Sequence, residues 1–190
     1  MKKALTSYRY IPINDLSRKW GCYVLDGGYT LVPAGSAYPI CKHPDDYHFT
    51  WEQGRTLHAY AMIYITRGQG RFESEISGEL PVKSGDLFVL HPEIWHRYQP
   101  DPKTGWDEYW IEFDGDYARK MMSHEAFRKE HPVLHPGYAQ PLVKLFMEVV
   151  ETLRQEPAEY ELLLGAHAGQ IIAQTLSALK RASYPKFLKL

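Results

Sequence analysis

Acidic residues gather in one aromatic stretch of the chain, WDEYWIEFD, which contains Asp107, Glu108, Glu112 and Asp114. The alternation of apolar and polar residues there predicts a β-strand, in which every second side chain faces the same way. Glu108 and Glu112 then share a face, with Trp110 between them. A pair of carboxylates can act as acid and base, as in glycoside hydrolysis. The pair can equally divide, one carboxylate accepting hydrogen bonds in a pocket and the other pairing with a basic neighbour, and the residue types leave both options open.

A second candidate for chemistry is the group His91, Glu93 and His96. Imidazole and carboxylate groups are ligands of zinc and other transition metals, and a catalytic metal needs about three protein ligands. The three residues are close in sequence, which leaves an unusual metal site open as an option. Other catalytic signatures are absent, since the sequence has no Gly-x-Ser-x-Gly elbow, Walker loop or dinucleotide-binding fingerprint.

These residues lie in a region whose pattern predicts several short antiparallel strands joined by tight turns. Strands are expected near residues 58–66, 70–76, 86–90, 94–98 and 106–113, with turns at Arg67–Gly70, Ser84–Asp86 and Lys103–Gly105. Upstream of them we expect an irregular arm over residues 1–20, a hairpin of two strands over Cys22–Val32 around Asp26-Gly27-Gly28, a loop over 33–46 and a strand at Tyr47–Trp51.

After Asp114 the apolar pattern changes from the period of strands to that of helices. It predicts a short helix in DGDYARKMM, an amphipathic helix over residues 137–154 with Pro141 near its start, and a second long helix over 158–181. The apolar face of the second long helix is expected to comprise Leu163, Leu164, His167, Ile171, Ile172, Thr175 and Leu179. Small residues on this helix allow a close approach, so we expect the two long helices to pack as an antiparallel pair.

Composition excludes several classes of protein. The 190 residues are 44% hydrophobic and 24% charged with a formal net charge of −1, which fits a folded globular domain and not a basic nucleic-acid-binding one. The two cysteines, Cys22 and Cys41, form neither a CxxC motif nor a disulfide framework. We see no signal-peptide core and no run of membrane-spanning length, and therefore expect a cytoplasmic protein with no membrane partner.

Three motifs together resemble a known family. The run GDLFVLHPEIWH at 85–96 is similar to the second cupin motif, YITRGQG at 64–70 is similar to the end of the first, and the WDEYWIEF strand follows them. With these motifs, residues 20–180 resemble the N-terminal effector-binding and dimerisation domain of AraC-family transcription regulators. The resemblance implies a mainly β fold with C-terminal α structure, in which a cupin-like (jelly-roll) antiparallel barrel is followed by an antiparallel pair of long helices.

The resemblance also implies a domain division: an N-terminal arm at 1–21, a cupin-like ligand-binding barrel at 22–116, a helical dimerisation segment at 117–182, and a linker at 183–190 to a helix-turn-helix DNA-binding domain absent from this chain. A small-molecule effector, a carbohydrate or related polar compound, would bind inside the barrel. A homodimer would form through the C-terminal helices, and DNA would be contacted only by the absent domain. The alternative function is that of a cupin-type enzyme, an isomerase or dioxygenase acting on a sugar or small acid.

Metal-dependent cupins bind their ion with two histidines, a glutamate and a further histidine from the second motif. The matching positions of this chain hold Arg55, Leu57, Ala61 and His96, so only the last ligand is retained. One imidazole cannot hold a catalytic metal. The comparison therefore implies a barrel with no metal, no cofactor and no catalytic residue, which is a sensor and not an enzyme.

By the same resemblance, to a sugar-sensing member of the family, five ligand-binding residues are expected: Thr30, Arg55, Tyr98, Glu108 and Trp110. His96, the retained histidine of the second motif, is expected on an inward position with them and is the sixth. Trp110 would stack on the C–H face of a sugar and Tyr98 would donate its hydroxyl, while Glu108 stands where that sensor has a histidine. Structural alternatives stay open for several of them: Trp110 and Tyr98 as barrel core, Arg55 as a surface partner of Glu52, and His96 as a buried, hydrogen-bonded histidine.

Overall fold

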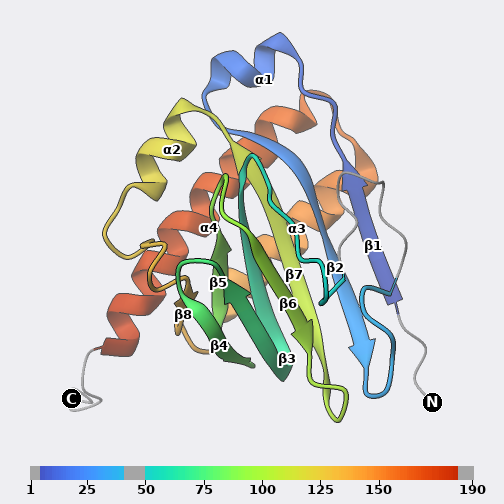
Figure 1. The fold of residues 1–190 in the computed structure, drawn as a ribbon. Coiled ribbons are helices and arrows are strands. Elements are labelled where there is room, and N and C mark those ends of the chain that lie inside the picture. Colours follow the sequence, from blue (N-terminus) through green and yellow to red (C-terminus); the bar gives the residue numbers. More distant parts are fainter. Residues whose placement is uncertain (1–4, 41–49, 184–190) are drawn as a thin grey trace, which may run out of the picture.

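The computed structural model describes residues 5–40 and 50–183. Its strands are β1 (Leu5–Tyr10), β2 (Tyr23–Pro33), β3 (Tyr60–Ser74), β4 (Gly78–Lys83), β5 (Leu87–Leu90), β6 (His96–Pro100), β7 (Gly105–Asp114) and β8 (Val133–Leu134). Its helices are α1 (Asp15–Trp20), α2 (Asp116–Met122), α3 (Gln140–Gln155) and α4 (Tyr160–Ser183). The prediction of antiparallel β structure followed by two long helices is confirmed (Figure 1).

The strand β3 belongs to two sheets. Residues 60–68 of β3 pair with β7 and β5, in a sheet ordered β1-β2-β7-β3-β5-β8, whereas residues 69–74 pair with β4 and β6. The change of sheet follows a register shift between Ile65 and Arg67. At Gly68 the backbone has φ 84°, and an added Cβ would lie 2.0 Å from the carbonyl oxygen of Gly105. The predicted turn at Arg67–Gly70 is therefore wrong, because glycine serves here for a bulge and a close strand approach.

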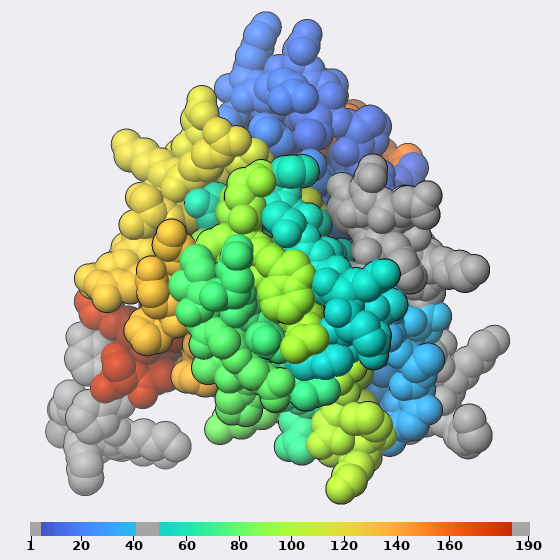
Figure 2. All heavy atoms as spheres, viewed as in Figure 1, coloured from blue at the N-terminus to red at the C-terminus, as the bar shows by residue number. Residues whose placement is uncertain are grey.

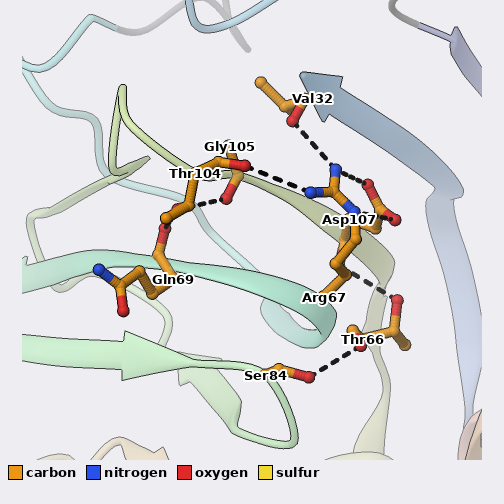
Figure 3. Close-up of polar contacts among 8 residues, drawn as sticks. All are labelled: Val32, Thr66, Arg67, Gln69, Ser84, Thr104, Gly105 and Asp107. Carbon is orange, nitrogen blue, oxygen red and sulfur yellow. Dashed lines mark hydrogen bonds and ion pairs between the residues drawn. The ribbon is translucent and has the colours of Figure 1, made fainter. Parts of the chain in front are cut away.

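The side chain of Arg67 ties three strands together beside this bulge (Figure 3). Its Nε and Nη2 donate to the two carboxylate oxygens of Asp107 at 2.8 and 2.6 Å. Its Nη1 donates to the carbonyl oxygen of Thr104 at 3.2 Å, and Nη2 also donates to that of Val32 at 3.3 Å. We call this group of four residues the Arg67 clamp, because it joins the end of β2, the beginning of β7 and the middle of β3.

The strand β2 is continuous, so the predicted hairpin over Cys22–Val32 is also wrong. The two glycines allow close packing on both faces of the strand. A Cβ at Gly27 would lie 3.2 Å from Cγ1 of Val149 on α3, and one at Gly28 would lie 2.3 Å from the carbonyl oxygen of Ser7 on β1. Part of the expected irregular arm is likewise the ordered strand β1, paired with β2, and the helix α1.

Two other expectations differ from the structure. The strand expected at Tyr47–Trp51 lies mostly outside the described residues, and its described end, Thr50 and Trp51, is not in a strand. The strand β4 was not expected and pairs with β3 as the hairpin partner of its second half. The turns at Ser84–Asp86 and Lys103–Gly105 are confirmed.

Helices α3 and α4 cover one face of the larger sheet (Figure 1). Between helices and sheet lies one hydrophobic cluster, to which β7 contributes Ile111 and Phe113 and the helices contribute Phe146 and Leu164. A second cluster fills the space between the two sheets, with Trp106, Phe72 and Phe88 among its largest side chains. The strand β7 therefore separates two interiors: its odd-numbered apolar residues face the helices, and the other face points between the sheets.

The helix α4 differs from expectation in two respects. It is long and apolar enough by length and composition alone to cross a membrane, with a mean hydropathy of 1.3 over an 18-residue window. The expectation that no run approaches that length was therefore wrong. In the structure its apolar residues Leu164, Ile171 and Ile172 are buried in the helix–sheet cluster, as in a core helix. Leu163, expected on the packed face, is 45% exposed.

Candidate functional site

A cavity of about 40 Å³ lies between the two sheets, on the face of β7 opposite the helices. A water molecule needs roughly 10–15 Å³ on this measure, so the cavity has room for small polar groups. It is lined by Tyr10, Asp26, Thr30, Tyr38, Pro39, Ile40, Arg55, Ala61, Ile63, Tyr98, Glu108, Trp110 and Glu112. All the ligand-binding residues expected from the sequence line it, with the exception of His96.

The strand β7 supplies the acidic and aromatic wall of the cavity. Glu108, Trp110 and Glu112 all line it, which confirms that the two glutamates share a face with the tryptophan between them. The other two acidic residues of the stretch point elsewhere. Asp107 belongs to the Arg67 clamp, and Asp114 accepts two hydrogen bonds from Arg119 at 2.8 and 2.6 Å.

Glu108 is buried, with 5% of its surface exposed. The Tyr38 hydroxyl lies 3.1 and 3.0 Å from its two carboxylate oxygens and donates to them. Burial raises the pKa of Glu108 to about 8, although the Tyr38 hydrogen bond and the charge of Arg55 both oppose the rise. The carboxyl group is thus mostly protonated at neutral pH and half-protonated only near pH 8, and its protonated form can both donate and accept a hydrogen bond.

Asp26 on β2 and Glu112 on β7 are directly opposite each other in the strand register and face the same cavity. The indole Nε1 of Trp110 donates to Oδ1 of Asp26 at 2.7 Å. Burial raises the pKa of Asp26 to about 6, against the opposing effects of Arg55 and this hydrogen bond. Burial, followed by the neighbouring charge of Asp26, raises the pKa of Glu112 to about 8, and Arg55 again opposes the shift.

Arg55 brings the positive charge to this acidic wall. Its backbone N–H donates to the carbonyl oxygen of His96 at 2.9 Å, and the reciprocal bond is also 2.9 Å, so the residue is held against the start of β6. Its Nη2 donates to the Tyr98 hydroxyl at 3.0 Å. Burial alone would lower the pKa of Arg55, but the nearby Tyr98, Asp26 and Glu112 raise it, so the guanidinium stays charged.

The segment that carries Arg55 is fixed on the outer surface of the smaller sheet. Figure 2 shows residues 50–58 packed beside β6 and the β3–β4 hairpin. The ring of Trp51 lies under two guanidinium groups, with Cζ of Arg71 3.7 Å and Cζ of Arg97 4.3 Å from its centroid. Nε1 of Trp95 also donates to the carbonyl oxygen of Gln53 at 2.9 Å. These contacts set the position at which Arg55 enters the cavity.

His96 is buried but lies in a neighbouring cavity of about 10 Å³ that is also lined by His91. Its ring is 6.3 Å from that of Tyr98, on the same side of β6. Its Nδ1 donates to the carbonyl oxygen of Ile94 at 3.0 Å. Burial and the charge of Arg55 lower the pKa of His96 to about 3, so the ring is neutral. The alternative of a buried, hydrogen-bonded histidine therefore describes it, and its side chain lies beside Tyr98 without lining the cavity of the other five expected residues.

The group His91, Glu93 and His96 is not assembled as a metal site. The carboxylate of Glu93 pairs at the surface with His58, Oε1 to Nδ1, at 2.6 Å. Across residues 5–40 and 50–183 no three His, Cys, Asp or Glu side chains are grouped so that they could hold a metal ion.

Sequence reasoning missed the polar lining residues Tyr10, Asp26 and Tyr38, together with four apolar ones. Asp26 was assigned to a hairpin turn and Tyr38 to a loop, although an aspartate inside a strand next to glycine is itself a signal of close packing. Tyr10 was placed in an irregular arm. Each of them depends on a tertiary contact that periodicity does not report.

The chain was compared with known proteins. A family model described as the AraC-like ligand binding domain matches residues 35–172. The MmsAB operon regulatory protein of Pseudomonas aeruginosa is 33% identical over 95 residues, which cover 48% of this chain and 31% of that protein. The Msm operon regulatory protein of Streptococcus mutans is 26% identical over 92 residues, covering 48% and 32%. The matched part thus spans about a third of the length of these relatives.

Solved structures show only a distant likeness. ToxT from Vibrio cholerae has 11% identity and a TM-score of 0.41, with 100% of this chain and 60% of that chain covered. The cupin domain of Cnp3 from Schizosaccharomyces pombe has 12% identity and a TM-score of 0.38, with 63% and 70% covered.

Proposed function

The chain belongs to the family of AraC-like ligand-binding domains, and from this premise we propose that it is the effector-sensing part of a transcription regulator and binds a sugar or related small polar molecule in the cavity between its sheets. The observation that carries the proposal is the convergence of Arg55, Glu108 and Trp110 on one enclosed cavity. Buried charged groups require partners, and a polar ligand with hydroxyl groups supplies them.

The aromatic wall supports a carbohydrate in particular. The Trp110 ring offers a flat apolar face beside the carboxylate of Glu108 and the hydroxyl groups of Thr30 and Tyr98. A sugar has the same division, with C–H groups on its faces and hydroxyl groups around its edge. In this assignment Thr30, Arg55, Tyr98, Glu108 and Trp110 contact the ligand, and His96 supports the backbone of Arg55 from behind.

The regulatory part of the proposal concerns the helices. We propose that α3 and α4 form the contact between two copies of the chain, in which the exposed apolar residues Met147 and Leu163 would be covered. DNA contact is assigned to a helix-turn-helix domain outside this chain, and the protein would act in the cytoplasm. An enzyme acting on a sugar or small acid is the competing function, and turnover of a bound sugar would reveal it.

A thermal-shift panel of mono- and oligosaccharides tests the proposal. A ligand present at a hundred times its dissociation constant stabilises the folded state by about 2.7 kcal/mol, roughly 5–10 °C for a domain of this size. We expect at least one sugar to give such a shift and Trp110→Ala to abolish it without unfolding the domain. Trp20→Ala, at an exposed position on α1, is the matched control and should keep the full shift. A Trp110→Ala variant that responds normally would contradict the assignment.

A further inference from the structure

The cavity lining holds more carboxyl groups than basic groups. Asp26, Glu108 and Glu112 contribute three carboxyl groups, and Arg55 is the only basic residue of the lining in the part of the chain that the structure describes. A neutral sugar would leave this imbalance as it is. A cation would correct it, since a buried carboxylate is stabilised chiefly by an opposite charge at hydrogen-bonding distance.

The imbalance is concentrated at one place. Asp26 and Glu112 are register partners on neighbouring strands, and like charges in that arrangement repel each other. Asp26 has the indole N–H of Trp110 as a donor. Glu112 is 5% exposed and lines the cavity, yet it makes no hydrogen bond with any residue within 5–40 or 50–183.

The other carboxyl group of the cavity is already supplied. Glu108 receives the Tyr38 hydroxyl on both of its oxygens. Arg55 donates a hydrogen bond to Tyr98. It makes no hydrogen bond to Glu112, which lies on the opposite wall of the cavity. Once ionised, Glu112 and the second oxygen of Asp26 therefore offer acceptors that receive no hydrogen bond from a described residue, which is the complement of an ammonium group with three donors.

A metal ion does not fit the same place, because among the described residues no three acidic, histidine or cysteine side chains are grouped to bind one. An organic ammonium group needs fewer and more widely spaced acceptors.

We propose that Asp26 and Glu112 form a subsite for the ammonium group of an amine-bearing sugar or polyol, so that the effector is a cation and not a neutral sugar. The inference rests on the proposed function and narrows the class of its ligand. Trp110 and Glu108 then contact the uncharged part of the molecule, and Glu112 is the residue that determines the preference for an amine over a hydroxyl group.

Binding is then coupled to a proton. In the empty cavity Glu112 keeps its proton because ionisation beside Asp26 in a buried site is unfavourable. When the ammonium group binds, the carboxyl ionises and its proton passes to solvent, so the affinity for the amine rises with pH up to about 8, the value to which burial and Asp26 raise the pKa of Glu112. The titratable groups that face Glu112 in the lining are Tyr10 of β1, Asp26 of β2, Tyr38, Arg55, Tyr98 of β6 and Glu108 of β7.

Calorimetric titration at pH 8 with matched pairs of compounds tests the inference. The pairs are 6-amino-6-deoxy-D-glucose with D-glucose, 6-amino-6-deoxy-D-galactose with D-galactose, and 1-amino-1-deoxy-D-sorbitol with D-sorbitol. In the pair that binds, we expect the amine to bind at least about tenfold more tightly than the alcohol. Glu112→Gln should reduce that ratio to about one, and Glu125→Gln, on the surface between α2 and β8, should leave it unchanged.

A second measurement needs no ligand. Glu112→Gln should raise the melting temperature relative to the wild type at pH 8.5 and leave it nearly unchanged at pH 5, because the amide resembles the neutral carboxyl. The inference is overturned if an alcohol binds as tightly as its amine, or if Glu112→Gln keeps the ratio, and in both cases the sugar-sensing proposal survives. If no compound of either kind binds and Glu112→Gln has no pH-dependent effect, both proposals fail.

Discussion

Two arginine–carboxylate groups share the strand β7, which carries Asp107 of one and Glu108 and Glu112 of the other, and they are built differently. In the Arg67 clamp one arginine makes four hydrogen bonds to one carboxylate and two carbonyl oxygens, at the surface. In the cavity one arginine faces three buried carboxyl groups, and Glu112 makes no hydrogen bond with a described residue. The clamp is complete by itself, whereas we propose that a bound ligand completes the cavity.

The extent to which its polar atoms are hydrogen-bonded distinguishes a structural polar group from a binding one. A polar cluster whose hydrogen bonds are all made within the protein contributes to folding and needs no ligand. A buried cluster with excess acceptors costs stability in the empty state, and a ligand recovers that cost. The clamp and the cavity should therefore respond differently to pH, to substitution and to salt.

The largest expected effect is a loss of stability as pH rises. Burial raises the pKa of Asp26 to about 6 and those of Glu108 and Glu112 to about 8. Groups whose folded pKa is raised stabilise the fold fully below their unfolded values and lose that contribution as pH rises through about 8. We expect the free energy of unfolding, from urea titrations between pH 5 and 9, to fall by several kcal/mol, since one pKa unit corresponds to about 1.4 kcal/mol.

The double variant Glu108→Gln with Glu112→Gln should flatten this decline. Asp107→Asn, which changes the clamp, should leave its slope as in the wild type. If the free energy of unfolding of the double variant falls with pH as steeply as that of the wild type, the cavity is not the source of the pH dependence.

A smaller effect is expected from removing the clamp. Arg67 is half-exposed and Asp107 is 20% exposed, so Arg67→Met should lower the free energy of unfolding by about 1 kcal/mol. Arg67→Lys should recover part of the loss, because it keeps the charge but not the two-pronged geometry. Ligand-induced shifts should persist in both variants, and loss of the shift in Arg67→Met would show that the two regions are coupled.

The smallest effect concerns salt. The clamp is open to solvent, so its contribution should decrease by a few tenths of a kcal/mol between 0.1 and 1 M sodium chloride. The cost of Arg67→Met, measured by urea unfolding at the two concentrations, should shrink accordingly. The pH slope of the unfolding free energy, which arises from the buried carboxyl groups, should stay nearly constant. If salt changed this slope as much as it changes the cost of Arg67→Met, the two groups would not differ in burial.

Much of the fold follows from alternation. Apart from β4, the strands between residues 58 and 113 were predicted from their alternation, and the two long helices were predicted because one face of each is apolar and the other polar. The errors fall at Gly27, Gly28 and Gly68, where glycine was interpreted as a turn. Glycine equally permits close contact between layers, and only the tertiary structure decides between the two.

The site was predicted where a single strand determines it. Glu108 and Trp110 follow from the period of β7, and Arg55 and Tyr98 from the family resemblance. Asp26 and Tyr38 enter through contacts between segments distant in sequence, such as the hydrogen bonds from Tyr38 to Glu108. His96 was expected in the same cavity as the retained, inward-facing histidine of the second motif, but it lines the adjacent cavity.

The alternation of β7 has a consequence for how such a domain diversifies. Positions 108, 110 and 112 line the cavity, while Ile111 and Phe113 support the helices from the opposite face. In the proposed function, ligand preference and fold stability thus depend on different residues of one short strand. Substitution at the even-numbered positions can exchange one effector for another while the helix-bearing face is inherited unchanged, and a designer who wants a new sensor has the same freedom.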